Sequence, residues 1–151
     1  MFIDTNVLVN SRIAQAPHHE IARECLSLAL DGNEPLRISR QVVREYLSVM
    51  TRPQTWSVAI MLEDALDDVD RLTRSFEVLE DGPVVTETLI ALCRAIPIGG
   101  KQIHDANIVA TMLAHGTRRL LTFNTADFRR YGDRIELVDT QSNRDNHRRG
   151  T

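Results

Sequence analysis

The chain has 151 residues, of which 42% are hydrophobic, and this length fits one compact domain with a sizeable core. No run of about 18 apolar residues occurs, which excludes a membrane-spanning helix. The N-terminus has no basic region followed by an apolar stretch, so we expect no secretory signal and a cytoplasmic protein. The formal net charge of -3 excludes a surface that is basic throughout.

Short apolar runs alternate along the chain with longer stretches of helical period. In chain order we predict a strand at 1–3, a helix at about 18–31, a strand at 36–38, helices at 39–50 and 57–72, a strand at 76–79, helices at 84–95 and 102–114, and strands at 120–122 and 135–138. This alternation is typical of an α/β fold with a parallel sheet. We expect residues 1–140 to form one domain and residues 141–151 to be a polar, disordered tail.

Acidic residues stand where several of these elements end or begin. Asp4 follows the first strand and Asp127 follows the fourth, and in an open parallel sheet the carboxyl ends of the strands meet at one edge. Asp105 lies in the first turn of its helix, where the dipole favours a carboxylate, and Glu45 lies on the buried side of the helix at 39–50, where it needs a partner. Each acid alone is explained by a cap or an arginine partner, but together they indicate one site.

Carboxylates gathered in one pocket repel one another and persist as anions only if a cation lies among them. Hard oxygen ligands select Mg²⁺ or Mn²⁺, and such ions assist the hydrolysis of phosphodiesters. Residues 118–151 hold eight arginines against five acids. We predict that Arg118, Arg119, Arg129 and Arg130, which flank Asp127, contact phosphates; ordinary solvated arginines explain the same charge equally well.

Four segments of this chain resemble the PIN-domain nucleases, in particular the VapC-type toxins of bacterial toxin–antitoxin pairs. They are Ile3-Asp4-Thr5-Asn6, Arg44-Glu45, His104-Asp105-Ala106, and Thr122-Phe123-Asn124 through Asp127-Phe128. They occur in the expected order, and the resemblance covers about residues 1–138. It implies a three-layer α/β/α fold with a parallel sheet of about five strands in the order 3-2-1-4-5. It also implies Mg²⁺ or Mn²⁺ bound by acids, endoribonuclease activity on RNA, and a homodimer inhibited by a small antitoxin.

The resemblance also implies roles for single residues. Asp4, Glu45, Asp105 and Asp127 would be the catalytic metal ligands, directly or through water. Thr5 would orient Asp4 or a bound water. Asn124 matches a position that the family often fills with Asn or Asp, and an asparagine there weakens a second ion. We therefore expect one tightly held ion, with another arriving on the RNA phosphate.

Other functions stay open. Phosphatases of the haloacid-dehalogenase type also have an aspartate after the first strand. Their motif there is Asp-x-Asp, and this chain has Asn6 in place of the second aspartate. A non-catalytic PIN-like module that binds RNA or regulates, and an RNA-processing nuclease without an antitoxin, are the remaining alternatives. Dependence of cleavage on metal separates the nuclease from the binding module.

Two further features concern packing. We interpret Trp56, beside Pro53, as a packing residue rather than a base-stacking one. The helix at 57–72 carries more apolar residues than one narrow stripe needs; we expect them to pack in the core, with a dimer mate or antitoxin as the alternative. Its acids are expected to form a solvated face: Glu63, Asp64, Asp67, Asp68 and Asp70.

Overall fold

A parallel sheet lies at the centre of the computed structural model, which describes residues 1–140; the predicted polar tail from residue 141 lies outside the described residues. The strands are β1 (Phe2–Ile3), β2 (Arg37–Ser39), β3 (Glu77–Leu79), β4 (Arg119–Leu121) and β5 (Glu136–Leu137). Their order is β3-β2-β1-β4-β5 and every pairing is parallel. Each predicted strand is therefore confirmed to within one residue at either end, and so is the implied strand order.

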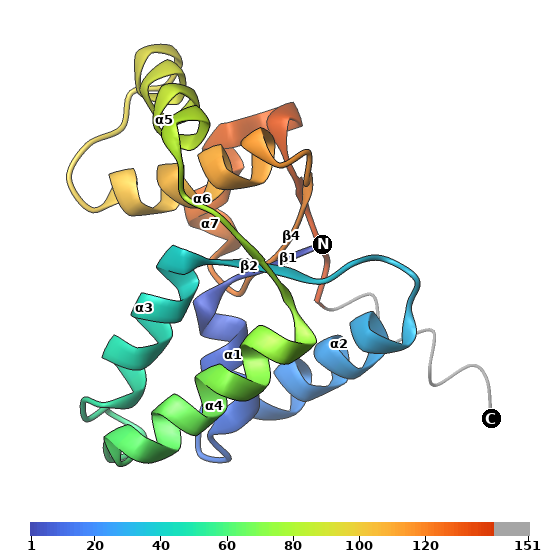
Figure 1. Cartoon of the computed structure of the whole chain (residues 1–151), viewed down its shortest axis with the longest axis vertical. Coiled ribbons are helices and arrows are strands. Elements are labelled where there is room, and N and C mark those ends of the chain that lie inside the picture. Colours follow the sequence, from blue (N-terminus) through green and yellow to red (C-terminus); the bar gives the residue numbers. More distant parts are fainter. Residues whose placement is uncertain (141–151) are drawn as a thin grey trace.

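Helices cover both faces of this sheet, which gives three layers (Figure 1). On one side lie α1 (Thr5–Arg12), α2 (His19–Asp31), α3 (Arg40–Met50) and α4 (Leu62–Ser75). On the other side lie α5 (Pro83–Ala95), α6 (Gln102–Ala114), α7 (Thr125–Phe128) and the 3-10 turn η1 (Arg129–Arg134). No helix in the described part of the chain is long and apolar enough to cross a membrane.

Helix α1 is absent from the predicted elements. Thr5, Val7 and Val9 are β-branched and weak helix formers, so local propensity disfavours a helix here. The helix forms because the backbone of Asp4 is extended and its side chain accepts a hydrogen bond from the first amide, which makes Asp4 the N-cap. Val7 and Leu8 are then buried in the core, and this packing outweighs propensity.

The predicted helix at 57–72 is wrong at its start, because α4 begins at Leu62. The preceding segment is held in a different way. Ser57 forms an isolated antiparallel bridge with Gln54, and the amide of Ile60 donates to the carbonyl of Met50 over 3.0 Å. These bonds close the segment against the end of α3. The carbonyl of Ser57, which a longer helix would use as an acceptor, accepts instead from the amide of Gln54 at 2.7 Å.

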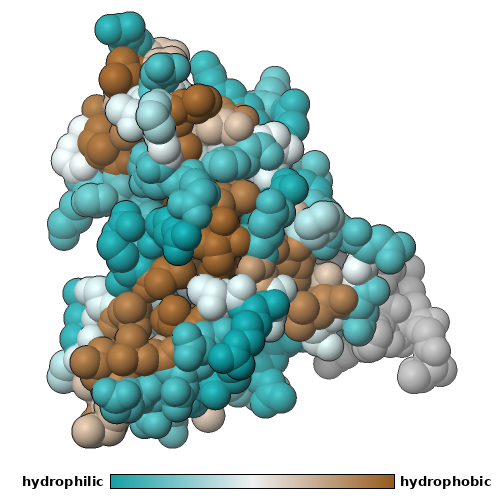
Figure 2. Space-filling model, viewed as in Figure 1, coloured by the Kyte–Doolittle hydropathy of each residue, from teal (hydrophilic) through white to brown (hydrophobic). Residues whose placement is uncertain are grey.

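This early break leaves apolar side chains on the surface instead of in the core. Val58 is 82% exposed and Met61 is 73% exposed. With Leu62 and Leu66 they form an apolar patch at the start of α4, at the lower left of Figure 2. The expectation that these residues pack in the core is therefore wrong. Because several large apolar side chains are exposed together, the patch is a candidate contact surface.

One acid of α4 does not belong to the solvated face. Asp68 is 5% exposed and accepts a hydrogen bond of 2.8 Å from the hydroxyl of Tyr46. It also forms ion pairs with Arg12, at 3.0 Å, and with Arg71. Burial and the bond to Asp68 raise the pKa of Tyr46. The Asp68 carboxylate thus joins α4 to α1 and α3, whereas the other acids of α4 are exposed as predicted.

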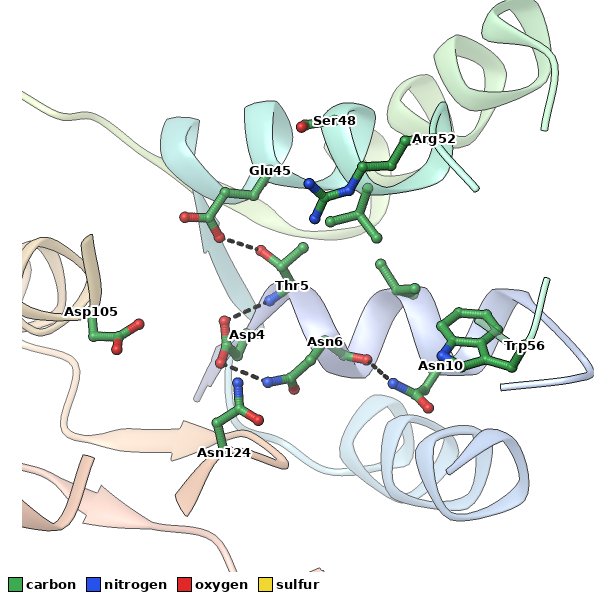
Figure 3. A pocket seen from close by; sticks show the side chains of 12 residues that line it. Asp4, Thr5, Asn6, Asn10, Glu45, Ser48, Arg52, Trp56, Asp105 and Asn124 are labelled. Atoms are coloured by element: carbon green, nitrogen blue, oxygen red, sulfur yellow. Dashed lines mark hydrogen bonds between the residues drawn. The ribbon is translucent and has the colours of Figure 1, made fainter. Parts of the chain in front are cut away.

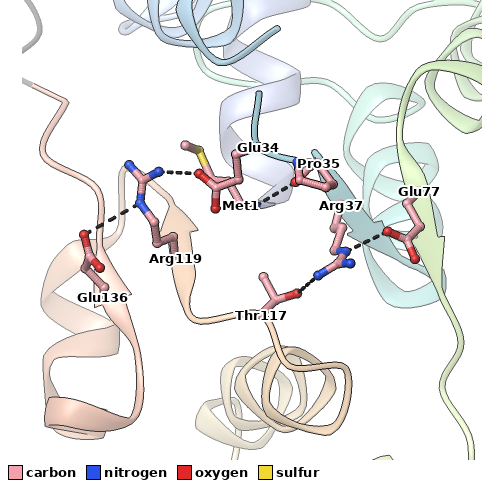
Figure 4. Close-up of polar contacts among 8 residues, drawn as sticks. All are labelled: Met1, Glu34, Pro35, Arg37, Glu77, Thr117, Arg119 and Glu136. Atoms are coloured by element: carbon pink, nitrogen blue, oxygen red, sulfur yellow. Dashed lines mark hydrogen bonds and ion pairs between the residues drawn. The ribbon is translucent and has the colours of Figure 1, made fainter. Parts of the chain in front are cut away.

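Paired charges close the edge of the sheet at which the strands begin (Figure 4). Arg37 opens β2 and pairs with Glu77, its neighbour in β3, at 2.7 Å. Arg119 opens β4 and pairs with Glu34 and, at 3.6 Å, with Glu136 in β5. The ammonium group of Met1 lies 2.8 Å from Glu34. These ion pairs link β2 to β3, β4 to β5 and, through Glu34, the start of β1 to β4. Met1 also joins β1 to the segment before β2 by donating to the carbonyl of Pro35.

Candidate functional site

Asp4 lies at the opposite edge, where β1 ends and α1 begins. One carboxylate oxygen accepts from the Thr5 amide at 2.8 Å, and the other accepts from the Thr122 hydroxyl at 2.7 Å and the Asn6 amide group at 3.1 Å. The side chain is 6% exposed. Burial raises the pKa of Asp4 to about 6 against these hydrogen bonds, and the charges of two further acids raise it slightly more.

Those further acids are Glu45 and Asp105, and Thr5 links the first of them to Asp4. The Thr5 hydroxyl donates to Glu45 over 2.8 Å while the Thr5 amide binds Asp4 (Figure 3). The second carboxylate oxygen of Glu45 accepts from Gln41 at 2.7 Å. Thr5 therefore binds two carboxylates at once, and its supporting role at the site stays a prediction.

Asp105 lies in the first turn of α6 and faces the same pocket from the other side of the sheet (Figure 3). Its pKa is raised, first by burial and then by the negative charges of Asp127 and Glu45, while Arg130 opposes the shift. Asp127 lies on α7, is exposed, and does not line the pocket. The structure thus gathers three of the predicted acids around one pocket and sets the fourth beside Asp105.

The pocket has a volume of about 400 Å³. It is lined by Asp4, Thr5, Asn6, Val9, Asn10, Glu45, Ser48, Val49, Arg52, Trp56, Asp105 and Asn124. The side chain of Asn124 points toward Asp4 (Figure 3), so the predicted position is at the site. Arg52 was not predicted. It follows Glu45 by seven residues, two helical turns along the same face, and this spacing is the signal that could have revealed it.

The predicted arginines divide between two places. Arg118 donates to the carbonyl of Asp133, and Arg119 is engaged in the ion pairs at the opposite edge of the sheet. The structure therefore does not bring either of them to the acids. Arg130 is close enough to Asp105 to lower its pKa, and Arg129 is exposed beside it. Of these four predicted arginines, Arg130 is the one that lies near an acid of the site.

The acids fit a divalent cation by their chemistry. They offer hard oxygen ligands, and none of the four forms an ion pair with a cationic side chain in the described part of the chain. Within residues 1–140, however, no three His, Cys, Asp or Glu side chains stand close enough to form a ready-made metal cluster. The site is therefore an acidic pocket with oxygen ligands of the right kind, of which Asp4 and Glu45 accept hydrogen bonds from neutral groups.

The sequence profile of the PIN domain matches residues 1–134, and this chain belongs to the PIN-domain family. A search of curated proteins gave no significant match.

Several solved structures share the fold. A toxin–antitoxin complex from Klebsiella pneumoniae aligns with a TM-score of 0.65 at 19% identity, covering 92% of this chain and 96% of that one. VapBC2 from Rickettsia felis, solved with a DNA fragment from its promoter, gives 0.64 at 18% identity, covering 91% and 96%. Mycobacterium tuberculosis VapC20, a toxin that cleaves the Sarcin-Ricin loop, gives 0.60 at 18% identity, covering 79% and 85%. At these sequence identities the alignments show that the fold is shared.

Proposed function

We propose that this protein is a metal-dependent endoribonuclease that hydrolyses RNA phosphodiester bonds, and that it is the toxin of a type II toxin–antitoxin system. The observation that carries this proposal is the meeting of Asp4, Glu45 and Asp105 at one pocket of a PIN domain. These acids come from three separate segments and form no ion pair with the described residues, an arrangement that costs stability and is typical of functional sites.

Asp4, Glu45, Asp105 and Asp127 would hold Mg²⁺ or Mn²⁺, and PIN domains generally use divalent metal ions. When bound, such a cation offsets negative charge on the phosphate and makes a water more acidic. Burial disfavours the ionised form of Asp4, and a cation favours it, so the raised pKa of Asp4 supports the fit.

The polar neighbours of the acids keep them oriented. Thr122 and Asn6 fix one oxygen of Asp4, and Thr5 fixes the other oxygen through its amide. Asn124 presents a neutral amide where a fifth carboxylate would strengthen a second ion. We therefore infer one tightly held ion, with a second one arriving on the RNA phosphate.

The partner proposed for this toxin is a small antitoxin, and its solved relatives include toxin–antitoxin complexes. The apolar patch at the start of α4 supports this. Met61 and Val58 are exposed there beside the acids Glu63 and Asp64, so the surface fits an antitoxin segment that is both apolar and basic. A homodimer and a cytoplasmic location complete the proposal.

Cleavage of a mixed RNA pool tests the reaction. The purified protein should cut RNA with Mg²⁺ or Mn²⁺, stop in EDTA, and lose cleavage as Asp4→Asn. Equal cutting by Asp4→Asn would trace the activity to a contaminating nuclease. The ends of the products would identify the cleaved sequence.

A second candidate is a non-catalytic RNA-binding module, which is favoured by the lack of a ready-made three-ligand cluster in residues 1–140. Metal binding can be measured without any reaction. Mg²⁺ at about 100 times its dissociation constant should stabilise the fold by about 2.7 kcal/mol. Thermal unfolding of the wild type should show this, and that of Asp4→Asn should not. RNA binding with neither cleavage nor metal stabilisation would establish the binding module instead.

The toxin role has its own test. A small protein encoded beside the nuclease should bind it and suppress cleavage. A cleaving enzyme that no such neighbour inhibits would be an RNA-processing nuclease without an antitoxin.

A further inference from the structure

The pocket has two chemically different halves (Figure 3). The half already described holds the acids and their neutral donors. The other half is bounded by the last turns of α1 and α3 and by the segment between α3 and α4. Its lining is apolar apart from one guanidinium and two small polar side chains: Val9, Asn10, Ser48, Val49, Arg52 and Trp56.

Trp56 gives this half an aromatic wall. The side chain is half-buried, packs against the core on one side, and lines the pocket on the other. The segment that carries it is fixed at both ends, because Gln54 exchanges backbone bonds with Ser57 and its side chain donates to the carbonyl of Val49 over 3.1 Å. No other aromatic ring in the described residues stacks on Trp56. A ring held in this way is a platform for a flat ligand.

Arg52 gives the same half a positive charge. Among the described residues it is the one cationic side chain that lines the pocket, and in Figure 3 its guanidinium points toward Glu45. Its side chain is exposed and makes no ion pair or hydrogen bond with the described residues, unlike those of Arg12 and Arg119. A guanidinium without a carboxylate partner is available to an anion, and its planar fork suits a phosphate.

The polar neighbours do not compete for this role. The side chain of Asn10 is partly used, since it donates to the carbonyl of Asn6 and accepts from the amide of His18, and these two bonds fix its orientation. The main features that the walls offer a ligand are therefore a stacking surface and a charge. Such a surface accepts every base and binds the larger rings more strongly.

We propose that this half of the pocket is a nucleoside subsite, in which the base next to the cleaved bond stacks on Trp56 and Arg52 binds the adjoining phosphate. The subsite deepens the proposed nuclease function and rests on it. It revises the interpretation of Trp56 as a packing residue alone, and it places the phosphate contact on Arg52 rather than on Arg118 or Arg119.

The chain contains one tryptophan, so its fluorescence reports on this subsite directly. The probes are tetraribonucleotides of A and of U, titrated into the Asp4→Asn protein, which should bind RNA without cutting it. Trp56 emission should change with the same midpoint as RNA binding measured independently by anisotropy. The tetramer of A should bind more tightly than the tetramer of U, because the purine stacks over more of the ring.

The arginine has a matched control. Arg52→Gln should weaken binding about tenfold, the loss expected for one charge-assisted contact to a phosphate. Arg74→Gln removes an exposed arginine on α4, away from the pocket, and should leave binding unchanged. Equal effects of the two changes would mean that Arg52 contributes only to net charge, and would overturn its role.

Cleavage kinetics give an independent readout. Trp56→Leu should raise KM about tenfold with kcat nearly unchanged, and Trp56→Phe should restore most of the affinity. Thermal unfolding of both variants checks that the segment still packs. A fall in kcat with KM unchanged, or a loss that phenylalanine does not rescue, would overturn the stacking role.

The outcomes separate this subsite from the nuclease proposal. RNA that binds without any change in Trp56 emission, to a protein whose wild type cleaves RNA, would overturn the subsite alone. A wild type that neither binds nor cleaves RNA would overturn both.

Discussion

The two edges of the sheet differ in whether their carboxylates are paired with cations. At the edge where the strands begin, Arg37 faces Glu77 and Arg119 joins Glu34 to Glu136, so each of these acids has a cationic partner. At the edge where β1 and β4 end, the described residues that hold Asp4 and Glu45 are neutral donors. The first edge stabilises the sheet, whereas the second keeps like charges together at a cost in stability. Paired charges of the first kind are typical of structural contacts, and unpaired like charges of the second kind are typical of functional sites.

The largest expected effect comes from neutralising one acid at the second edge. Glu45→Gln keeps the size of the side chain but removes the charge, and RNA cleavage should fall by more than about 100-fold. Groups that merely support a metal ligand already cost about 10–100-fold. Steady-state cleavage of an RNA oligonucleotide measures the loss. Cleavage within threefold of the wild type would remove Glu45 from the proposed site.

The next effect is on stability, through Asp4. Its pKa is about 6 in the folded protein against 3.8 for an unperturbed aspartate, so the folded state holds the proton more tightly. Protonated Asp4 therefore contributes to the free energy of unfolding in full below pH 3.8. This contribution, about 1–3 kcal/mol, is lost as the pH rises to about 6.

Asp4→Asn cannot ionise and should escape this loss. In EDTA it should unfold at a higher temperature than the wild type at pH 8, and the gap should close toward pH 4. Thermal unfolding across this range measures both curves. A variant that is less stable than the wild type at pH 8 would show that the ionised carboxylate stabilises the fold.

A smaller effect is expected from the residue that links the two carboxylates. Thr5→Val removes the hydroxyl that binds Glu45 but keeps the amide that binds Asp4. Cleavage should fall about tenfold, as for other groups that orient metal ligands. Thr88→Val is the control, since its hydroxyl bonds to a carbonyl within α5. Equal activity of the two variants would leave Thr5 with a packing role alone.

The smallest effect belongs to the paired edge. Partial burial raises the pKa of Glu34, but the Met1 ammonium and Arg119 outweigh it and lower the pKa overall. Glu34→Gln should cost about 0.5–1 kcal/mol of stability at neutral pH, because the pair is partly exposed and screened. Denaturant unfolding measures this cost, and cleavage should be unchanged. A loss of cleavage equal to that of Glu45→Gln would erase the distinction between the edges.

The strands and the acids at their ends were predictable because both depend on local order along the chain. An apolar run followed by Asp4, or by Asn124 and Asp127, identifies both a strand and the edge of the sheet at which these polar side chains gather. Helix α1 was not predictable in this way, because its stability comes from burial of Val7 and Leu8 rather than from propensity.

Long-range pairing explains the other differences. Asp68 looks like its acidic neighbours in the sequence, yet Arg12 and Tyr46 meet it from distant positions in the chain. Arg119 is close to Asp127 in sequence but lies at the other edge of the sheet. Trp56 was correctly expected to pack, but its second face toward the pocket depends on how the segment after α3 closes.

The contact between Tyr46 and Asp68 has a consequence for variation in this protein. Glu45 and Tyr46 are neighbours on α3, and the first faces the pocket while the second is held by α4. The exposed acids of α4 should tolerate substitution, since their side chains face solvent. Asp68 should not, because losing it would leave two arginines and a buried hydroxyl without their carboxylate. Helix α4 contributes no side chain to the pocket, but through Asp68 and Tyr46 it fixes the position of α3 and so of Glu45.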